Sequence, residues 1–299
     1  MKTNASFARL ASCVAVLLVT NLSAQESAPA PAASVAPQRA RDRDPSWLMD
    51  KVEGPNLHYR TFDSKAAGSK VSYLIYLPPG YGHDEKRRYP VVYWLHGIGG
   101  SQQGVPEMAR RMNQAIEAGK MPPVIFVYCN GMIRSGWSDA QWPVETVTIK
   151  ELIPYIDANY RTIATREGRG VEGFSMGGGG ASVWGFKYTD LFGTVSIIAG
   201  AMRNPHAPAP AARGPRANPW ELVEKNVHAI RGRTHVRIAV GEKDNLKNTN
   251  TSLHEFLVKH DIEHEFDVVP DAAHSPNPVY QGLGDRNWAF YQKAFGQAR

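Results

Sequence analysis

Short apolar runs alternate along this chain with longer segments in which apolar residues recur at helical spacing. The runs have the length and β-branched content of strands, and they cover residues 57–62, 70–77, 91–95, 124–128, 170–174, 194–198, 235–240 and 265–269. The helical segments cover 106–118, 144–159, 176–188, 220–228, 246–260 and 286–295. This alternation predicts an α/β fold, a mainly parallel sheet with helices on both faces. A Gly-containing turn joins the first two runs, which predicts an antiparallel hairpin at one edge of the sheet.

The first 46 residues do not share this pattern. Residues 1–24 have a basic start at Lys2 and Arg9, an apolar stretch at 13–19 and a small-residue site at 22–24, which together are typical of a secretory signal peptide. The apolar stretch is too short to cross a bilayer, so no membrane span is predicted. Residues 25–46 are rich in Ala, Pro and Ser, and we expect a flexible tether there. The sequence therefore predicts one folded domain over residues 47–299 of a secreted or periplasmic protein.

The composition of the 299 residues, 42% hydrophobic and 21% charged, is that of an ordinary globular protein. It excludes a disordered chain, a small disulfide-rich scaffold and a fibre. The net charge of +6 falls to +4 when Lys2 and Arg9 are removed with the leader, and no run of five basic residues occurs. Nucleic acid is therefore not an expected partner. Loss of Cys13 leaves Cys129 alone, which excludes an intramolecular disulfide, while the oligomeric state stays open.

The sequence Gly173-Phe174-Ser175-Met176-Gly177 matches the G-x-S-x-G motif between a predicted strand and a predicted helix. A sharp turn at this junction would force Ser175 into strained backbone geometry, and the two glycines would remove side chains that collide with neighbouring elements. Ser175 would then lie above the sheet, at the positive end of the following helix. The alternative is a Gly-rich loop that only packs helix against strand. The strand before the motif and the helix after it favour a nucleophile.

A serine hydroxyl needs a base and an acid to become a nucleophile, and in this architecture the acid and then the base follow the serine along the chain. Asp244 follows the seventh predicted strand and His274 follows the eighth, so both lie at the carboxyl edge of the sheet with Ser175. Asp267 and Asp271 are rival acids. However, Asp267 lies within a strand and Asp271 is only three residues from His274, which favours structural roles for both. We therefore predict a triad of Ser175, Asp244 and His274.

A tetrahedral intermediate also needs N–H donors for its oxyanion. The backbone of Met176, the residue after the nucleophile, is the expected source of one donor. The other is expected from the loop after the third strand, residues 95–100, whose glycines let the backbone approach a substrate closely. Ile98 is the donor predicted there. His96 lies at the strand end, and we expect it to brace this loop rather than to act as a base.

Two further patterns suggest a cofactor or a metal, but their context argues against both. Residues 168–173 match G-x-G-x-x-G, yet this segment precedes and overlaps a strand, whereas a dinucleotide fingerprint follows one. Residues 260–264 match an inverted zinc-protease motif, which requires both histidines on one helix face. Here a helix ends and a strand begins. The sequence therefore predicts neither a cofactor nor a metal.

Three segments of the chain together resemble a known family. They are YWLHGIGG at 93–100, ELIPYID at 151–157 and GFSMGGG at 173–179. They are similar to the esterase D-type α/β-hydrolases, and most similar to the bacterial feruloyl and acetyl xylan esterases of carbohydrate esterase family 1. The resemblance covers residues 55–295 and implies an α/β-hydrolase fold. It also implies the triad and the oxyanion donors named above, Ser175, Asp244, His274, Ile98 and Met176.

The same resemblance implies that one polar and aromatic loop borders the acyl pocket. Its side chains are Trp137, Asp139, Trp142 and Glu145. Ordinary packing is the alternative for the two aromatic residues. The chain departs from the family at residues 203–219, a proline-rich stretch expected to be a surface loop, and in the long tail between His274 and Trp288. Substrate choice is therefore the property that the resemblance specifies least.

Together with the predicted leader, the resemblance implies an exported serine carboxylesterase that removes ester decorations from plant polysaccharide, most readily feruloyl esters, through an acyl-enzyme. The expected partner is thus an ester substrate, either small or linked to polysaccharide. Two alternatives use the same triad, an acetyl xylan or short-chain carboxylesterase and an acyltransferase. An inactive carbohydrate-binding relative is a further alternative. It is disfavoured because all five chemical positions are filled.

Overall fold

The structure is a computed structural model that describes residues 46–203 and 217–297. The predicted leader at 1–24 lies outside the described residues, as does the predicted tether at 25–46 apart from its last residue. Most of the expected surface loop at 203–219 also lies outside them.

Eight strands form one sheet in the order β1-β2-β4-β3-β5-β6-β7-β8. Their bounds are β1 Leu57–Ser64, β2 Ser69–Tyr76, β3 Val91–Leu95, β4 Ile125–Tyr128, β5 Arg169–Phe174, β6 Thr194–Ile198, β7 His235–Gly241 and β8 His264–Val269. β1 pairs antiparallel with β2, which confirms the predicted hairpin, and β2 pairs antiparallel with β4. All other neighbours in the sheet are parallel. The carboxyl ends of the six parallel strands therefore lie at one edge of the sheet.

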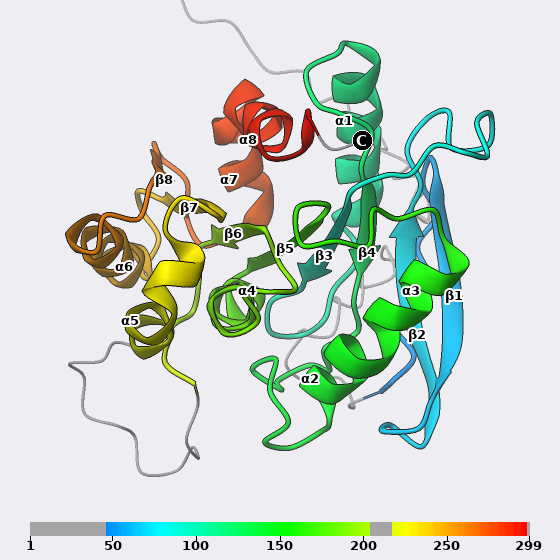
Figure 1. Cartoon of the computed structure of the whole chain (residues 1–299), viewed down its shortest axis with the longest axis horizontal. Helices are drawn as coiled ribbons and strands as arrows, with labels where there is room; N and C mark the ends of the chain where they lie inside the picture. The colour runs from blue at the N-terminus through cyan, green and yellow to red at the C-terminus, as the bar shows by residue number, and fades with distance from the viewer. Residues whose placement is uncertain (1–45, 204–216, 298–299) are drawn as a thin grey trace, which may run out of the picture. The chain divides into compact units, whose positions relative to one another are not determined.

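Helices cover both faces of this sheet (Figure 1). One face carries α1 Val105–Glu117, α7 Pro276–Leu283 and α8 Asp285–Phe295, whose apolar side chains pack on the sheet. The other face carries α3 Ile153–Asn159, α4 Met176–Lys187, α5 Pro219–Ile230 and α6 Lys247–Lys259. This is the predicted α/β arrangement, with element ends that differ from the prediction by a few residues.

The central strands show why the sequence folds this way. In β3, Val91, Tyr93 and Leu95 join the core on the α4 face, whereas Val92 joins the core on the α1 face. Successive side chains of a strand point to opposite faces, so a strand covered by helices on both faces must be apolar throughout. The nearly unbroken apolar runs of β3 and β4 follow from this burial, since every residue of β4 is buried.

The segment predicted as one helix over 144–159 is divided in the structure. It comprises α2 Val144–Thr146, the π-helical segment η2 Val147–Leu152, and α3. The wide turn ends where the Ile153 N–H donates to the Thr148 carbonyl, five residues earlier. Pro154 follows immediately and has no N–H to continue the regular pattern. Helical periodicity thus predicts the segment but not its irregular centre.

Helix α7 was not predicted from the sequence, where it fell in the long tail after His274. It begins at Pro276, which occupies the first helical position, after Ser275 in extended geometry. Proline is tolerated there because the first N–H groups of a helix have no intrahelical partner. The tail after His274 is therefore a short helix packed on the sheet through Val279, Tyr280 and Leu283.

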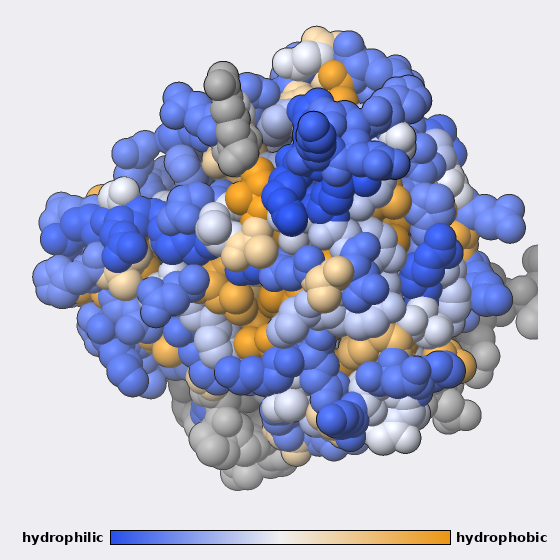
Figure 2. All heavy atoms as spheres, turned by 45° about the vertical axis from the view of Figure 1, so that its right-hand side comes forward, coloured by the Kyte–Doolittle hydropathy of each residue, from blue (hydrophilic) through white to orange (hydrophobic). Residues whose placement is uncertain are grey.

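The face drawn in Figure 2 is largely hydrophilic, with apolar patches near its middle. Four large hydrophobic residues are exposed among the described residues, namely Leu48, Ile98, Val258 and Val268. Cys129 is buried, and burial raises the pKa of its thiol. No helix in the described ranges is long and apolar enough to span a membrane.

Candidate active site

Ser175 lies at the turn between β5 and α4, as the motif predicts. Its backbone has φ 56° and ψ −116°, a conformation that a residue with a side chain rarely adopts. Hydrogen bonds on both sides hold this turn: the Ser175 N–H donates to the Ile198 carbonyl at 3.0 Å, and the Ala201 N–H donates to the Ser175 carbonyl at 2.8 Å. The end of β6 therefore fixes the strained residue.

The two motif glycines are required by close backbone contacts. A β-carbon on Gly177 would lie 1.9 Å from the Leu95 carbonyl oxygen at the end of β3. One on Gly173 would lie 2.2 Å from the Gly177 carbonyl oxygen. Both distances are far below van der Waals contact, so any side chain would push α4 away from the sheet. This confirms that the glycines remove side chains that would collide with neighbouring elements.

The structure brings the three predicted triad residues together. Ser175 Oγ lies 2.8 Å from His274 Nε2, and His274 Nδ1 lies 2.8 Å from Asp244 Oδ2. Ser175 and Asp244 are buried, whereas the His274 side chain is 35% exposed. Such a chain allows the imidazole to take the serine proton while the carboxylate orients the ring and stabilises its charge. The solvent-facing imidazole leaves room for a substrate to approach.

The loops after β7 and β8 fix the acid and the base. The Asp244 carboxylate accepts a second hydrogen bond, from the Leu246 N–H to Oδ1 at 2.8 Å, so both of its oxygens are used. The Lys243 N–H donates to the Ala272 carbonyl and joins the two loops. The ring of Phe174 stacks on the His274 imidazole with centroids 4.9 Å apart. The orientation of His274 therefore depends on a residue next to the nucleophile.

The rival acids lie in ion pairs with basic residues. Asp271 is exposed and pairs with Lys243 at 2.6 Å. Asp267 lies in β8 and pairs with Arg286. Asp244 is thus the acid that contacts His274.

The two expected oxyanion donors lie beside the nucleophile. Gly97, next to Ile98, is so near Ser175 that an added β-carbon would lie 3.3 Å from Ser175 Cβ. Within the described part of the chain, the backbone N–H groups of Ile98 and Met176 donate no hydrogen bond. Two free N–H groups next to a serine hydroxyl suit a developing oxyanion. Ile98 itself is 50% exposed.

His96 braces the oxyanion loop, residues 95–100, as expected. Its Nδ1–H donates to the Gly97 carbonyl at 2.8 Å, and its Nε2 accepts from the Gly131 N–H at 3.0 Å. Burial lowers the pKa of His96 to about 4, so the ring is neutral at neutral pH. Both ring nitrogens are therefore occupied.

The four residues that the family resemblance places at the acyl pocket make packing and capping contacts. Trp137 is 1% exposed and donates to the His96 carbonyl at 3.0 Å, so it supports the oxyanion loop. Asp139 accepts from the N–H and hydroxyl of Thr146. Trp142 packs against the core, and Glu145 binds Lys187 and Tyr188, each at 2.6 Å. A role for these residues in acyl binding stays a prediction.

Sequence reasoning missed a buried polar cluster directly beneath the site. The Glu172 carboxylate, three residues before Ser175, accepts hydrogen bonds from Ser196 at 2.7 Å, Arg237 at 2.8 Å, Tyr280 at 2.8 Å and Tyr291. Burial raises the pKa of both tyrosine hydroxyls, which keeps them protonated as donors. A signal existed, because Glu172 and Arg237 are opposite charges inside otherwise apolar strands. This cluster ties α7 and α8 to the strand that carries the nucleophile.

The two patterns set aside in the sequence remain outside the site. Residues 168–173 enter β5, and residues 260–264 run from the end of α6 to the start of β8. His264 contacts His254, with 2.7 Å between Nε2 and Nδ1. No group of three His, Cys, Asp or Glu side chains suited to a metal occurs in the described ranges.

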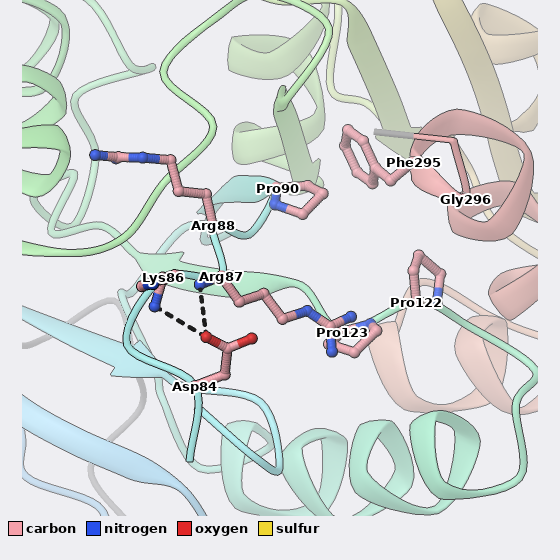
Figure 3. A pocket seen from close by; sticks show the side chains of 9 residues that line it. All are labelled: Asp84, Lys86, Arg87, Arg88, Pro90, Pro122, Pro123, Phe295 and Gly296. Atoms are coloured by element: carbon pink, nitrogen blue, oxygen red, sulfur yellow. Dashed lines mark hydrogen bonds between the residues drawn. The ribbon is translucent and has the colours of Figure 1, made fainter. Parts of the chain in front are cut away.

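A cavity of about 510 Å³ lies at the opposite edge of the sheet (Figure 3). Pro90, directly before β3, and Pro123, shortly before β4, line it. The cavity therefore lies at the amino ends of these two strands. Asp84 accepts hydrogen bonds there from the backbone N–H groups of Lys86 and Arg87. The cavity contains no member of the Ser175 hydrogen-bonded chain and is separate from the candidate site.

Comparison with known proteins places this geometry in context. Esterase Rv1288 of Mycobacterium tuberculosis is 36% identical over 163 residues, which is 51% of this chain and 34% of that protein. The endo-1,4-beta-xylanase/feruloyl esterase of Xylanibacter ruminicola is 30% identical over 234 residues, 73% of this chain and 32% of that protein. The chain thus spans about a third of the length of these curated relatives.

A solved structure of a ferulic acid esterase is similar with a TM-score of 0.71 at 25% identity, over 80% of this chain and 98% of that one. This likeness and the strand order identify an α/β-hydrolase fold. The Esterase family model matches residues 64–299, well over half of the chain. The protein therefore belongs to the Esterase family.

Proposed function

We propose that this protein is a serine carboxylesterase that hydrolyses feruloyl esters carried by plant polysaccharide. The observation that carries the proposal is the hydrogen-bonded chain from Ser175 through His274 to Asp244. A strained serine at the amino end of a helix, a base at 2.8 Å and two free N–H groups are the parts that acyl transfer requires.

In the proposed reaction, Ser175 Oγ attacks the ester carbonyl while His274 Nε2 takes its proton. The Ile98 and Met176 N–H groups bind the oxyanion of the tetrahedral intermediate, which then collapses. His274 gives the proton to the leaving alcohol, and an acyl-enzyme ester on Ser175 remains. Water, deprotonated by His274, attacks this ester and releases the acid, which restores the serine. Asp244 orients the imidazole throughout and needs no proton of its own.

Two comparisons support a feruloyl substrate over other esters. The Xylanibacter relative carries feruloyl esterase in its name, and the solved structure with TM-score 0.71 is named a ferulic acid esterase. The predicted leader at 1–24 supports export, which would bring the enzyme to a polymer that cannot enter the cell. An ester substrate, free or polysaccharide-linked, is the partner that this function requires.

The test is turnover of methyl ferulate by the purified protein and by Ser175→Ala. The variant should lose about 10⁶-fold in kcat and keep the unfolding midpoint of the wild type, because the hydroxyl is the nucleophile. Gln103→Ala changes an exposed residue shortly after the oxyanion loop; it serves as the control and should retain activity. Full activity in Ser175→Ala would exclude the proposed mechanism.

A substrate panel separates this proposal from its alternatives. Methyl ferulate, acetylated xylan and p-nitrophenyl acetate are compared by kcat/KM, and product analysis with an added competing alcohol detects acyl transfer. Preference for methyl ferulate with release of free acid supports the proposal. Turnover of acetyl esters alone would identify an acetylesterase, and transfer to the alcohol would identify an acyltransferase.

A further inference from the structure

The cavity at the amino ends of β3 and β4 lies at the edge of the sheet opposite the triad (Figure 3). Its volume of about 510 Å³ is within the range of about 300–1,000 Å³ that small-molecule sites occupy. Strand β3 has five residues, so a length of about 17 Å of sheet separates the two edges. A small ester bound at Ser175 therefore does not extend to this cavity.

Three consecutive basic residues line part of the cavity, namely Lys86, Arg87 and Arg88. All three are exposed. Arg88 donates from Nη1 to the Thr162 carbonyl at 3.1 Å, so its guanidinium is already used in part. Within the described residues, the Lys86 ammonium and the Arg87 guanidinium form no ion pair. These two cations are therefore available to a ligand.

Asp84 is the one acid among the described lining residues, and the loop itself uses its carboxylate. Oδ1 accepts from the backbone N–H of Lys86 at 2.9 Å and from that of Arg87 at 3.2 Å. The Arg87 carbonyl accepts from Arg161 Nε at 3.2 Å, and the Arg87 guanidinium lies 5.3 Å from the centroid of the Tyr89 ring. The cavity thus has an excess of positive charge on a loop with a fixed backbone, which suits an anionic ligand.

The rest of the lining forms an apolar wall, which consists of Pro90, Pro122, Pro123, Phe295 and Gly296. Figure 3 shows the Arg87 side chain extending toward Pro122 and Pro123, whereas the Arg88 guanidinium points away from them. The ligand that fits has an anionic group for the cations and a ring with an apolar face for this wall. A guanidinium binds a planar carboxylate through two parallel N–H groups, and the C–H face of a sugar ring is apolar.

We infer that this cavity binds a carboxylate-bearing sugar ring, with the Arg87 guanidinium and the Lys86 ammonium as partners of the carboxylate and the apolar wall against the ring. The inference rests on the proposed function for the source of this sugar, an acidic branch of the polysaccharide that carries the reacting ester. Nucleic acid is a poorer fit, because two unpaired cations match one anionic group and not a run of phosphates. A second contact of this kind keeps the polymer at the enzyme and raises the local concentration of its esters.

The first experiment measures the binding of small ligands to Ser175→Ala by chemical-shift titration. Glucuronate should bind about tenfold more tightly than glucose, because only glucuronate has the carboxylate. Inorganic phosphate is the third ligand, and it should bind more weakly than glucuronate because it has no ring for the apolar wall. Equal binding of glucuronate and glucose, or binding of phosphate as tight as that of glucuronate, would overturn the inference.

A double variant tests the two cations. Lys86→Met with Arg87→Met removes both charges and keeps unbranched side chains, so it should bind glucuronate no more tightly than glucose. Arg60→Met with Lys65→Met is the matched control, because it removes the same two charges from exposed positions on β1 and in the turn that follows it. The control should retain the preference for glucuronate. If both double variants lost it, the preference would come from net charge, and the cavity would not be the site.

Polymer kinetics separate this inference from the proposed function. The substrates are methyl ferulate, feruloylated xylan that bears glucuronic acid, and the same xylan after reduction of its carboxyl groups. Lys86→Met with Arg87→Met should raise KM about tenfold on the acidic polymer with kcat unchanged. Both constants should stay within about twofold on the other two substrates, because the cavity is remote from Ser175.

Equal losses on all three substrates would show that the substitutions disturb the catalytic edge, and an unchanged KM on the acidic polymer would show that the cavity does not retain it. Either result would overturn the inference. If the wild type hydrolysed no feruloyl ester, the proposed function would fail by itself. The titrations with glucuronate, glucose and phosphate would still decide what the cavity binds.

Discussion

Two hydrogen-bonded groups of side chains are built on the same strand, and they differ in exposure and in how fully their atoms are bonded. The buried group centres on Glu172 in the middle of β5, where four side chains donate to one carboxylate and Arg237 is fully buried. The edge group starts three residues later at Ser175. Within the described residues its hydroxyl hydrogen-bonds to the imidazole of His274 alone, and the His274 side chain is 35% exposed.

The difference shows how one strand can support both rigidity and chemistry. A buried carboxylate with all its hydrogen bonds made is fixed, because breaking any one bond leaves an unpaired polar group in a low-dielectric core. The serine has an unused lone pair and a strained backbone, and free N–H groups lie beside it. We expect changes in the buried group to reduce stability and changes at the edge to reduce activity.

The largest expected effect is at the edge. Asp244→Asn should lower kcat about 10⁴-fold, because an amide in place of the carboxylate favours the wrong imidazole tautomer and cannot stabilise the imidazolium. The unfolding midpoint should change little, since the amide retains an oxygen for the Leu246 N–H. Steady-state kinetics on methyl ferulate and a thermal melt measure both quantities.

Asp271→Asn is the matched control for this prediction. Asp271 lies three residues from His274 but is exposed and paired with Lys243, so its variant should keep full activity. If Asp271→Asn lost activity and Asp244→Asn did not, the assignment of the acid would be reversed.

The second prediction concerns the buried group. Arg237→Met removes the cation beside Glu172 and should lower the free energy of unfolding by about 3–5 kcal/mol, the usual cost of leaving one buried charge without its partner. Urea unfolding measures the change. The double variant Glu172→Leu with Arg237→Met should recover part of the loss, because it leaves no buried charge unpaired.

The surface pair of Lys293 and Glu263 provides the control. Both side chains are more than half exposed, so Lys293→Met should cost less than about 1 kcal/mol. A loss for Arg237→Met as small as the loss at this surface pair would show that the buried cluster does not stabilise the fold, and the comparison between the two groups would fail.

The same contrast explains what the sequence could predict. The edge group was predictable because its members follow strands in a fixed chain order, and parallel strands bring such loops to one edge. Ser175, Asp244 and His274 were each identified by this logic. Strand runs such as Val91–Leu95 were predictable because burial on both faces requires an apolar sequence.

The buried group was not predicted, because its partners are far apart in sequence and follow no short motif. Glu172 and Tyr291 are 119 residues apart, and only packing of α8 on the sheet brings them together. Helix α7 was missed because prolines at 276 and 278 indicate a loop when read one at a time, although Pro276 occupies the first helical position. Trp137 could not be placed either, because a sequence does not show which side of a loop an indole faces.

The third prediction uses a buried group at the active edge. His96 accepts a proton near pH 6.5 in the unfolded chain but only near pH 4 in the fold, because burial lowers its pKa. Between these values unfolding takes up a proton, so the stability that depends on neutral His96 is fully present above pH 6.5 and decreases as the pH falls. The loss amounts to about 3 kcal/mol by pH 4.

Urea unfolding at pH 7 and pH 4.5 tests this window. His96→Gln removes the titrating group and should flatten the pH dependence, with a lower stability at pH 7. His228→Gln, at an exposed position of α5, should keep the wild-type dependence. Equal pH dependence for the wild type and His96→Gln would show that His96 does not sense pH through folding.

The smallest expected effects concern the two tyrosines that donate to Glu172, one of which links the buried group to the edge group. Tyr280→Phe and Tyr291→Phe each remove one donor to Glu172, and each should cost about 1–2 kcal/mol of unfolding free energy. Tyr280 lies in α7, which begins two residues after His274, whereas Tyr291 lies in α8. Tyr280→Phe should therefore also lower kcat about tenfold by displacing the base, while Tyr291→Phe leaves kcat within twofold. Equal kcat values for the two variants at matched stability would mean that the buried group holds the fold together without positioning the catalytic edge.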